Sequence, residues 1–167
     1  MTTRVSLPGM RSPGAGFDQP FEMLDACHDR VRRSLDLLRH LRDYLRGHGH
    51  GCDDSARQAA RDVLRYFDIA APLHHEDEEL HVFPPLLAQE HDAPLVTLVR
   101  QLQRDHVRMA ERWATARGPL QAMADGQLPA FSAEHEAALD GFAECYADHL
   151  RHEDDSIYPA ARALLDP

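Results

Sequence analysis

The chain has 167 residues, 43% of them hydrophobic and 28% charged, and a net charge of −10 at pH 7. This length fits one domain with its own core, and the acidic balance argues against nucleic acid and anionic membranes as partners. No window holds the roughly 18 consecutive apolar residues of a membrane span. The first twenty residues lack the apolar core of a signal peptide, and the few cysteines are scattered, so the sequence predicts a cytoplasmic protein.

The first part of the chain predicts an arm followed by a helix. Residues 1–17 are rich in Gly, Pro and Ser, which is typical of a loose arm. A long amphipathic segment then runs from Asp18 to about Arg46, until the run GHGHG (47–51) breaks it. We therefore expect a single domain, with a helix at its start, in residues 18–167.

A second amphipathic segment predicts a helix that contains a proline. It begins at the N-cap candidates in residues 53–55 and runs to about Val82, where we expect Pro84 and Pro85 to end it. Pro72 lies inside this helix and costs about 3 kcal/mol unless a kink or bulge absorbs it. The sequence does not decide whether this distortion serves a nearby site or is only tolerated.

Two further helices complete the predicted fold. The third is expected at about 93–117, where Gly118 and Pro119 end or kink it, and the fourth at about 129–158, before Pro159. No segment shows the alternating β-branched pattern of a strand. Four helices with short connections predict an all-α fold, an antiparallel up-down four-helix bundle.

A repeat in the second and fourth helices singles out two pairs of polar residues. A shift of 75 residues aligns FDIAAPLHHEDEELHVFPPLL (67–87) with FAECYADHLRHEDDSIYPAAR (142–162). The shared unit is His-x-x-x-Glu followed six residues later by Pro, and the neighbouring His75 and His81 are not repeated. The repeat selects four residues: His74, Glu78, His149 and Glu153.

Both pairs are expected to point into the core. Residues four apart share one face of a helix, and that face is apolar around each pair. The first and third helices each place one histidine, His28 and His106, on their core stripe. An unpaired carboxylate in an apolar core costs several kcal/mol, and the nearest cations, Arg32 and Arg39, lie toward the edge of their stripe. Bound divalent cations would satisfy these groups, and twelve histidines, roughly threefold more than average usage, favour such a site.

The donor atoms predict the kind of metal. Imidazole nitrogen with carboxylate oxygen suits iron, manganese or zinc better than copper(I) or calcium. Carboxylates that can bridge favour a pair of ions, as in di-iron bundles. We therefore expect two iron ions, with zinc or manganese as possible substitutes.

These motifs resemble those of the hemerythrin-like, HHE cation-binding family. The resemblance extends from about Asp18 to Leu165 and rests on His28 and on three segments: HHEDEELHVFP, RDHVRMAERW and HLRHEDDSIYP. It implies a non-haem di-iron site in which each residue has a role: Glu78 and Glu153 bridge, His28 and His74 bind one iron, and His106 and His149 bind the other.

The chain departs from the oxygen-carrying hemerythrins of invertebrates in its third helix. Those proteins have His-x-x-x-His there and an Asp on the fourth helix, whereas Leu102 and Ala110 lie four residues before and after His106. One histidine fewer leaves a coordination position for water, a small ligand or another side chain. Two His-x-x-x-Glu motifs are more similar to bacterial proteins that repair iron–sulfur centres, whose N-terminal cysteine domain has no counterpart in these 167 residues.

Two functional hypotheses follow, and the sequence does not separate them. The first is a binding protein that captures or senses dioxygen, nitric oxide or iron, in oxidative or nitrosative stress. The second is a di-iron enzyme that reduces peroxide or nitric oxide, or oxidises ferrous iron. Buried carboxylates count against a purely structural bundle, and no nucleophile–base pair or phosphate loop indicates hydrolase or transferase chemistry. The oligomeric state is not fixed by the sequence.

Other polar residues near the motifs are expected to lie outside the set of ligands. Three histidines are expected to be solvated or to support the ligands, with metal contact as the alternative: His75, His81 and His152. Five acids are expected on a solvated face: Glu76, Asp77, Glu79, Asp154 and Asp155. A weaker surface metal site is conceivable at His48, His50 and Cys52. Cys27 is a candidate redox-sensitive thiol, and Cys145 and Trp113 are expected in the core.

Overall fold

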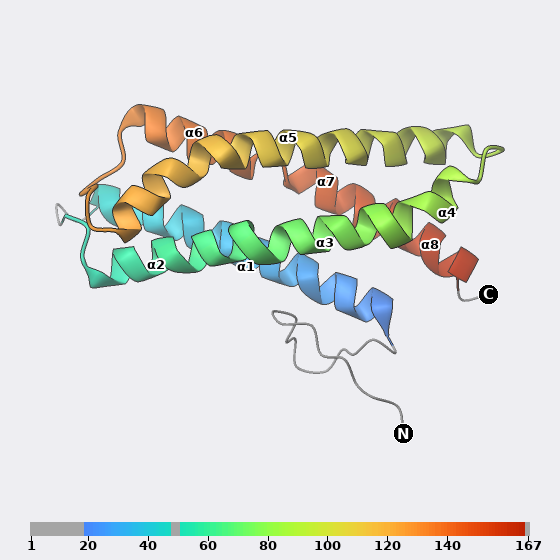
Figure 1. Cartoon of the computed structure of the whole chain (residues 1–167), viewed down its shortest axis with the longest axis horizontal. Helices are drawn as coiled ribbons and strands as arrows, with labels where there is room; N and C mark the ends of the chain where they lie inside the picture. The colour runs from blue at the N-terminus through green and yellow to red at the C-terminus, as the bar shows by residue number, and fades with distance from the viewer. Residues whose placement is uncertain (1–18, 48–50, 166–167) are drawn as a thin grey trace, which may run out of the picture.

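The computed structural model describes residues 19–47 and 51–165, and within these ranges it contains helices and no strands. The helices form four rods that run along the long axis of the molecule (Figure 1). Rod 1 is α1 (Pro20–Gly47), and rod 3 is α5 (Ala93–Ala124). Rods 2 and 4 are each composed of several helical segments. The predicted all-α four-helix bundle is thereby confirmed, whereas the predicted arm at residues 1–17 lies outside the described residues.

Rod 2 continues past the prolines that were expected to end it. It consists of five segments in sequence: α2 (Asp54–Arg65), η1 (Tyr66–Ala70), α3 (Ala71–Asp77), η2 (Glu78–Val82) and α4 (Phe83–Leu87). The side chain of Asp53 caps it, accepting a hydrogen bond from the Ala56 N–H at 2.9 Å. The expected end at Val82 is wrong, because the rod extends to Leu87 with Pro84 and Pro85 inside α4.

Rod 4 also differs from the single helix that was expected. It consists of α6 (Ala133–Ala143), α7 (Ala147–His152), η3 (Glu153–Ile157) and α8 (Tyr158–Leu165), with a turn at residues 144–146 between α6 and α7. The side chain of Ser132 caps α6 through the N–H of His135. The expected end at Tyr158 is wrong, because α8 continues through Pro159 to Leu165.

Three π-helical turns explain how the rods accommodate these prolines. Within the described residues, η1, η2 and η3 each have a proline two residues after their last residue: Pro72, Pro84 and Pro159. A proline cannot donate a backbone hydrogen bond, and its ring meets the carbonyl four residues earlier in a regular helix. A π-turn widens the helix and replaces the regular pairing by bonds between residues five apart, as from the Ala71 N–H to the Tyr66 carbonyl. The bulge that Pro72 requires is therefore present.

Rod 3 likewise extends beyond its expected end. Helix α5 continues past Gly118 and includes Pro119 before it ends at Ala124. Figure 1 shows its C-terminal part bending away from the straight segment before it. Of the two outcomes expected for Gly118 and Pro119, a kink fits the structure and an end does not.

The core of the bundle is divided into two apolar clusters. The larger contains residues such as Val31, Phe67 and Met109, and the smaller contains residues such as Phe83 and Leu102. In every rod a few buried polar residues lie between a segment of one cluster and a segment of the other. None of the described helices combines the length and apolar character needed to cross a lipid bilayer.

Candidate metal centre

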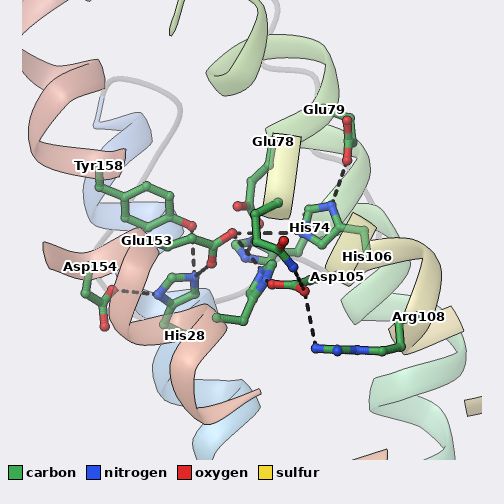
Figure 2. Close-up of polar contacts among 12 residues, drawn as sticks. His28, His74, Glu78, Glu79, Asp105, His106, Arg108, Glu153, Asp154 and Tyr158 are labelled. Carbon is green, nitrogen blue, oxygen red and sulfur yellow. Dashed lines mark hydrogen bonds and ion pairs between the residues drawn. The ribbon is translucent and has the colours of Figure 1, made fainter. Parts of the chain in front are cut away.

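The four rods bring the six predicted site residues together. All are at most 8% exposed, and Figure 2 shows five of them by label. Their donor atoms form two groups, each within 4.8 Å: His28, His74, Glu78 and Glu153 in the first, and His106, His149 and Glu153 in the second. Glu153 therefore belongs to both groups.

The two glutamates occupy equivalent positions in their rods. Glu78 is the first residue of η2 and Glu153 the first of η3, each directly after a short α-helix that carries the histidine of the pair. His74 Nε2 lies 2.7 Å from Glu78 Oε1, and His149 Nε2 lies 2.9 Å from Glu153 Oε1. The repeat found in the sequence thus corresponds to one local structure used twice: a histidine on an α-turn, then a glutamate that opens a π-turn.

Most donor atoms of the centre lack ordinary hydrogen-bond partners. Among buried side-chain nitrogen and oxygen atoms of the described residues, those without a partner all belong to the centre except Arg57 Nε. They include both carboxylate oxygens of Glu78 and Glu153 and the Nε2 atoms of three histidines. These atoms approach one another closely without the geometry of a hydrogen bond. Because buried unpaired carboxylates are destabilising, and nitrogen–oxygen donor sets of this kind suit divalent transition metals, the residues present fit a metal centre.

Three of the four histidines are held from behind by an acid. His28 Nδ1 lies 2.7 Å from Asp154 Oδ1, His106 Nδ1 lies 2.8 Å from Glu79 Oε1, and His149 Nδ1 lies 3.2 Å from Asp105 Oδ2. Each acid accepts the Nδ1 proton and leaves Nε2 facing the centre, which is the usual arrangement of metal-binding histidines.

The expectation of a solvated face was wrong for Glu79 and Asp154, which are half-buried and bond to histidines. Asp105 was missed altogether, although it directly precedes His106. It is 6% exposed and is itself held by Gln101 at 2.9 Å and Arg108 at 3.2 Å. The sequence signal that could have identified Asp105 was its position directly before the core histidine His106.

His74 differs from the other three histidines. Its Nδ1 has no hydrogen-bond partner, and the side chain next to it is that of Cys27. Burial lowers the pKa of His74, but the charge of Glu78 and the Cys27 side chain outweigh this and raise it to about 10. His74 therefore lacks the carboxylate that the other three histidines have at Nδ1.

The two buried glutamates influence each other strongly. Burial and the charge of Glu78 raise the pKa of Glu153 well above its ordinary value. Burial also opposes the ionisation of Glu78, but the charge of His74 next to it holds the pKa of Glu78 well below its usual range. Ionisation of one carboxyl group therefore opposes ionisation of the other, and the ionised form is the more strongly disfavoured at Glu153.

Two further side chains border the centre. The Tyr158 hydroxyl donates to His28 Nε2 at 2.9 Å, and burial raises the pKa of this phenol well above its ordinary value, so it stays protonated. Sequence reasoning did not assign Tyr158 to the site. The ring of His75 stacks on that of His106, with centroids 4.1 Å apart. Burial and His106 lower the pKa of His75 well below its usual value.

The other residues named from the sequence belong to neither of the two groups. His81 is exposed and His152 half-buried, and neither belongs to a group. His48 and His50 lie outside the described residues, and the Cys52 thiol is 3.8 Å from the carbonyls of Asp53 and Met123. Three residues are buried: Cys27, Cys145 and Trp113.

Comparison with known proteins decides the family. The profile of the hemerythrin HHE cation binding domain matches residues 19–161. The chain belongs to the hemerythrin family. A Haemophilus influenzae protein described as "Uncharacterized protein" is 40% identical to this hemerythrin-family chain over 100 residues, which are 59% of the chain and 55% of that relative. The match thus covers about half of the relative's length. The expected family is confirmed, and with it the binding of a metal cation, typically iron.

Proposed function

We propose that this hemerythrin-family bundle holds two iron ions and uses them to bind or sense a small molecule. One ion would be held by His28 and His74, and the other by His106 and His149. Glu78 and Glu153 would bridge them. The membership of Glu153 in both groups supports this arrangement. Zinc or manganese would fit the same donors.

The unequal size of the two groups carries the functional proposal. Glu78 belongs only to the first group, whereas Glu153 belongs to both, so the contact of Glu78 with the second ion would be the weaker one and the second ion would be less completely held. Bound ferrous iron supplies a redox-active centre that coordinates dioxygen or nitric oxide. The ligand would occupy the open position of the second ion, and the function would be to capture or sense that molecule, or iron itself, in oxidative or nitrosative stress.

The chain's own residues shape the surroundings of this position. His75, stacked on His106, is uncharged near neutral pH and supplies a hydrogen-bonding group close to the second ion. The buried ring of Phe83 lies against His106 on another side, with centroids 5.6 Å apart, and excludes water there. Glu79 and Asp105 fix the orientation of His106 and His149.

Iron loading tests the proposal. Protein loaded with ferrous iron without oxygen should hold close to two iron ions per chain, measured by metal analysis. Its visible absorption should change on exposure to oxygen or nitric oxide and return when the gas is removed. Many turnovers with peroxide or nitric oxide would instead favour the enzymatic alternative. Failure to retain iron would contradict both.

Two adjacent histidines provide a matched pair of variants. His74→Ala should lose bound iron, because it removes a donor of the first group. His75→Ala should retain the iron but release the gaseous ligand faster, because His75 lies beside the second group without belonging to it. The opposite result for iron content would show that the ligand set is assigned to the wrong residues.

A further inference from the structure

A cavity of about 450 Å³ lies between α1 and the segment from α2 to α3. His74 and Cys27, both buried, form its inner end, and the exposed Arg33 and Arg65 form its outer part. Neither histidine of the second group lines it. The cavity is therefore separate from the open coordination position that the proposed function uses.

The charge of this cavity is opposite to that of the whole chain. Three arginines and one acid line it, Arg30, Arg33, Arg65 and Asp62, whereas the protein as a whole carries a net charge of −10. Neither Arg33 nor Arg65 has a hydrogen-bonded or ion-paired partner among the residues that the structure describes. Two guanidinium groups without such partners at the mouth of a cavity favour an anionic group there.

The walls of the cavity are apolar. Ile69 and Leu73 line it and remain 54% and 42% exposed, although large hydrophobic side chains are mostly buried in this bundle. Tyr66, Ala70 and Cys27 add further apolar surface. A volume in the range of about 300–1,000 Å³, mainly apolar walls and a few charged groups are typical of sites for small organic molecules.

We propose that this cavity binds a small organic anion with an apolar body. The body packs against Ile69 and Leu73, and a carboxylate or sulfonate head binds Arg33 and Arg65. An inorganic anion such as phosphate would pair with the arginines but leave the apolar walls in contact with water. The cavity meets the metal centre only at His74, and binding does not require iron, so the proposal does not rest on the proposed function.

The probe for this site is 8-anilinonaphthalene-1-sulfonate, an aromatic sulfonate whose fluorescence increases in apolar surroundings. The folded, metal-free protein should bind one equivalent, and decanoate should displace it while phosphate at equal concentration should not. The same affinity is expected after iron loading. Displacement by phosphate as effective as by decanoate would overturn the apolar part of the proposal, and binding of several equivalents would show nonspecific uptake and overturn the site.

Exposed arginines provide matched variants that leave the core intact. The double variant Arg33→Gln/Arg65→Gln should weaken probe binding at least about tenfold, because it removes both head-group partners. The control Arg61→Gln/Arg151→Gln removes the same charge from positions outside the cavity and should bind as the wild type does. Ser34→Phe places a ring in the cavity and should abolish binding. Equal affinity of the two double variants would overturn the proposal.

Discussion

Single acids behind the histidines set the direction in which each donor nitrogen points. Asp154 accepts from His28 Nδ1 and also pairs with Arg32, which lowers the pKa of this acid further. Partners of this kind fix the ring and its tautomer, and their loss typically weakens metal binding roughly 10- to 100-fold. Asp154 therefore contributes to the proposed site by orienting the ring of His28, although it is not one of the proposed ligands.

Asp154→Asn should weaken iron binding by roughly 10- to 100-fold, because an amide does not stabilise the Nδ1 proton as a carboxylate does. Competition with a chelator of known affinity measures this change. The matched control is Asp155→Asn, since Asp155 is the next residue, carries the same charge and is exposed. Equal affinities of the two variants would show that Asp154 does not orient His28.

Asp68 provides a test of pH dependence at a distance from the metal centre. Hydrogen bonds from Arg117, and to a smaller extent from Trp113, lower the pKa of Asp68. A carboxyl group with a depressed folded-state pKa adds stability above its unfolded pKa of about 3.9, and this stability is lost as the pH falls through the lower folded value. Asp68→Asn should therefore lower the melting temperature at pH 7, and the difference from wild type should shrink toward pH 3.

The site was predictable where its chemistry repeats along the chain. His74 and Glu78 stood out because His149 and Glu153 recur at the same spacing, and a buried carboxylate needs a partner. Asp154 and Tyr158 were not recognised because their partner, His28, is more than 120 residues away on another rod. Helical periodicity gives the face of one helix but not which side chains of two helices meet.

At the scale of helical segments, the π-turns allow rods 2 and 4 to contain Pro72, Pro84 and Pro159. Pro72 follows η1, where the pairing between residues five apart has already replaced the regular pattern. The ring therefore causes no break, whereas a proline in a regular α-helix costs about 3 kcal/mol. The same argument applies to Pro84 and Pro159.

Pro72→Ala should change the free energy of unfolding by less than about 1 kcal/mol, because the backbone hydrogen bonds of η1 form without the proline ring. Ala114→Pro should destabilise by about 3 kcal/mol, because Ala114 is exposed inside α5, which contains no described π-turn. Urea denaturation followed by circular dichroism measures both. A large loss of stability on replacing Pro72 would mean that the ring itself maintains the turn.

The ends of the helices were predicted less well than their number. Prolines were interpreted as stops at Pro84 and Pro159, because sequence patterns do not show π-turns directly. The position of proline six residues after each repeated glutamate was visible, and the structure explains it: the glutamate opens the π-turn and the proline follows it. The turn at residues 144–146 left no comparable mark in the sequence.

At the scale of the whole molecule, a polar layer separates two apolar clusters. This layer contains two buried carboxyl groups that lack partners in the metal-free protein. Burial of such groups is destabilising. The carboxylates that the proposed function requires therefore lower the stability of the bundle when no metal is bound. Bound iron should offset this loss of stability, because its binding free energy stabilises the folded state.

Glu153→Gln should separate the destabilisation caused by the buried carboxyl group from the stabilisation caused by bound iron. Without metal, the variant should melt at the wild-type temperature or above it, because a neutral amide replaces a carboxyl group whose ionised form is disfavoured by burial. Iron should raise the melting temperature of the wild type but not of the variant, which lacks the group common to both sets of donors. Differential scanning calorimetry with and without iron measures both. An equal gain in the two proteins would exclude Glu153 as a ligand.

The membership of Glu153 in both groups has a consequence for metal loading if two ions bind as proposed. The first cation would fix the orientation of this carboxyl group, so the second would meet an acceptor already in place. Loading would then be cooperative, and chains with a single ion would be scarce at half saturation. A bundle with two independent pockets would instead fill in two separate steps.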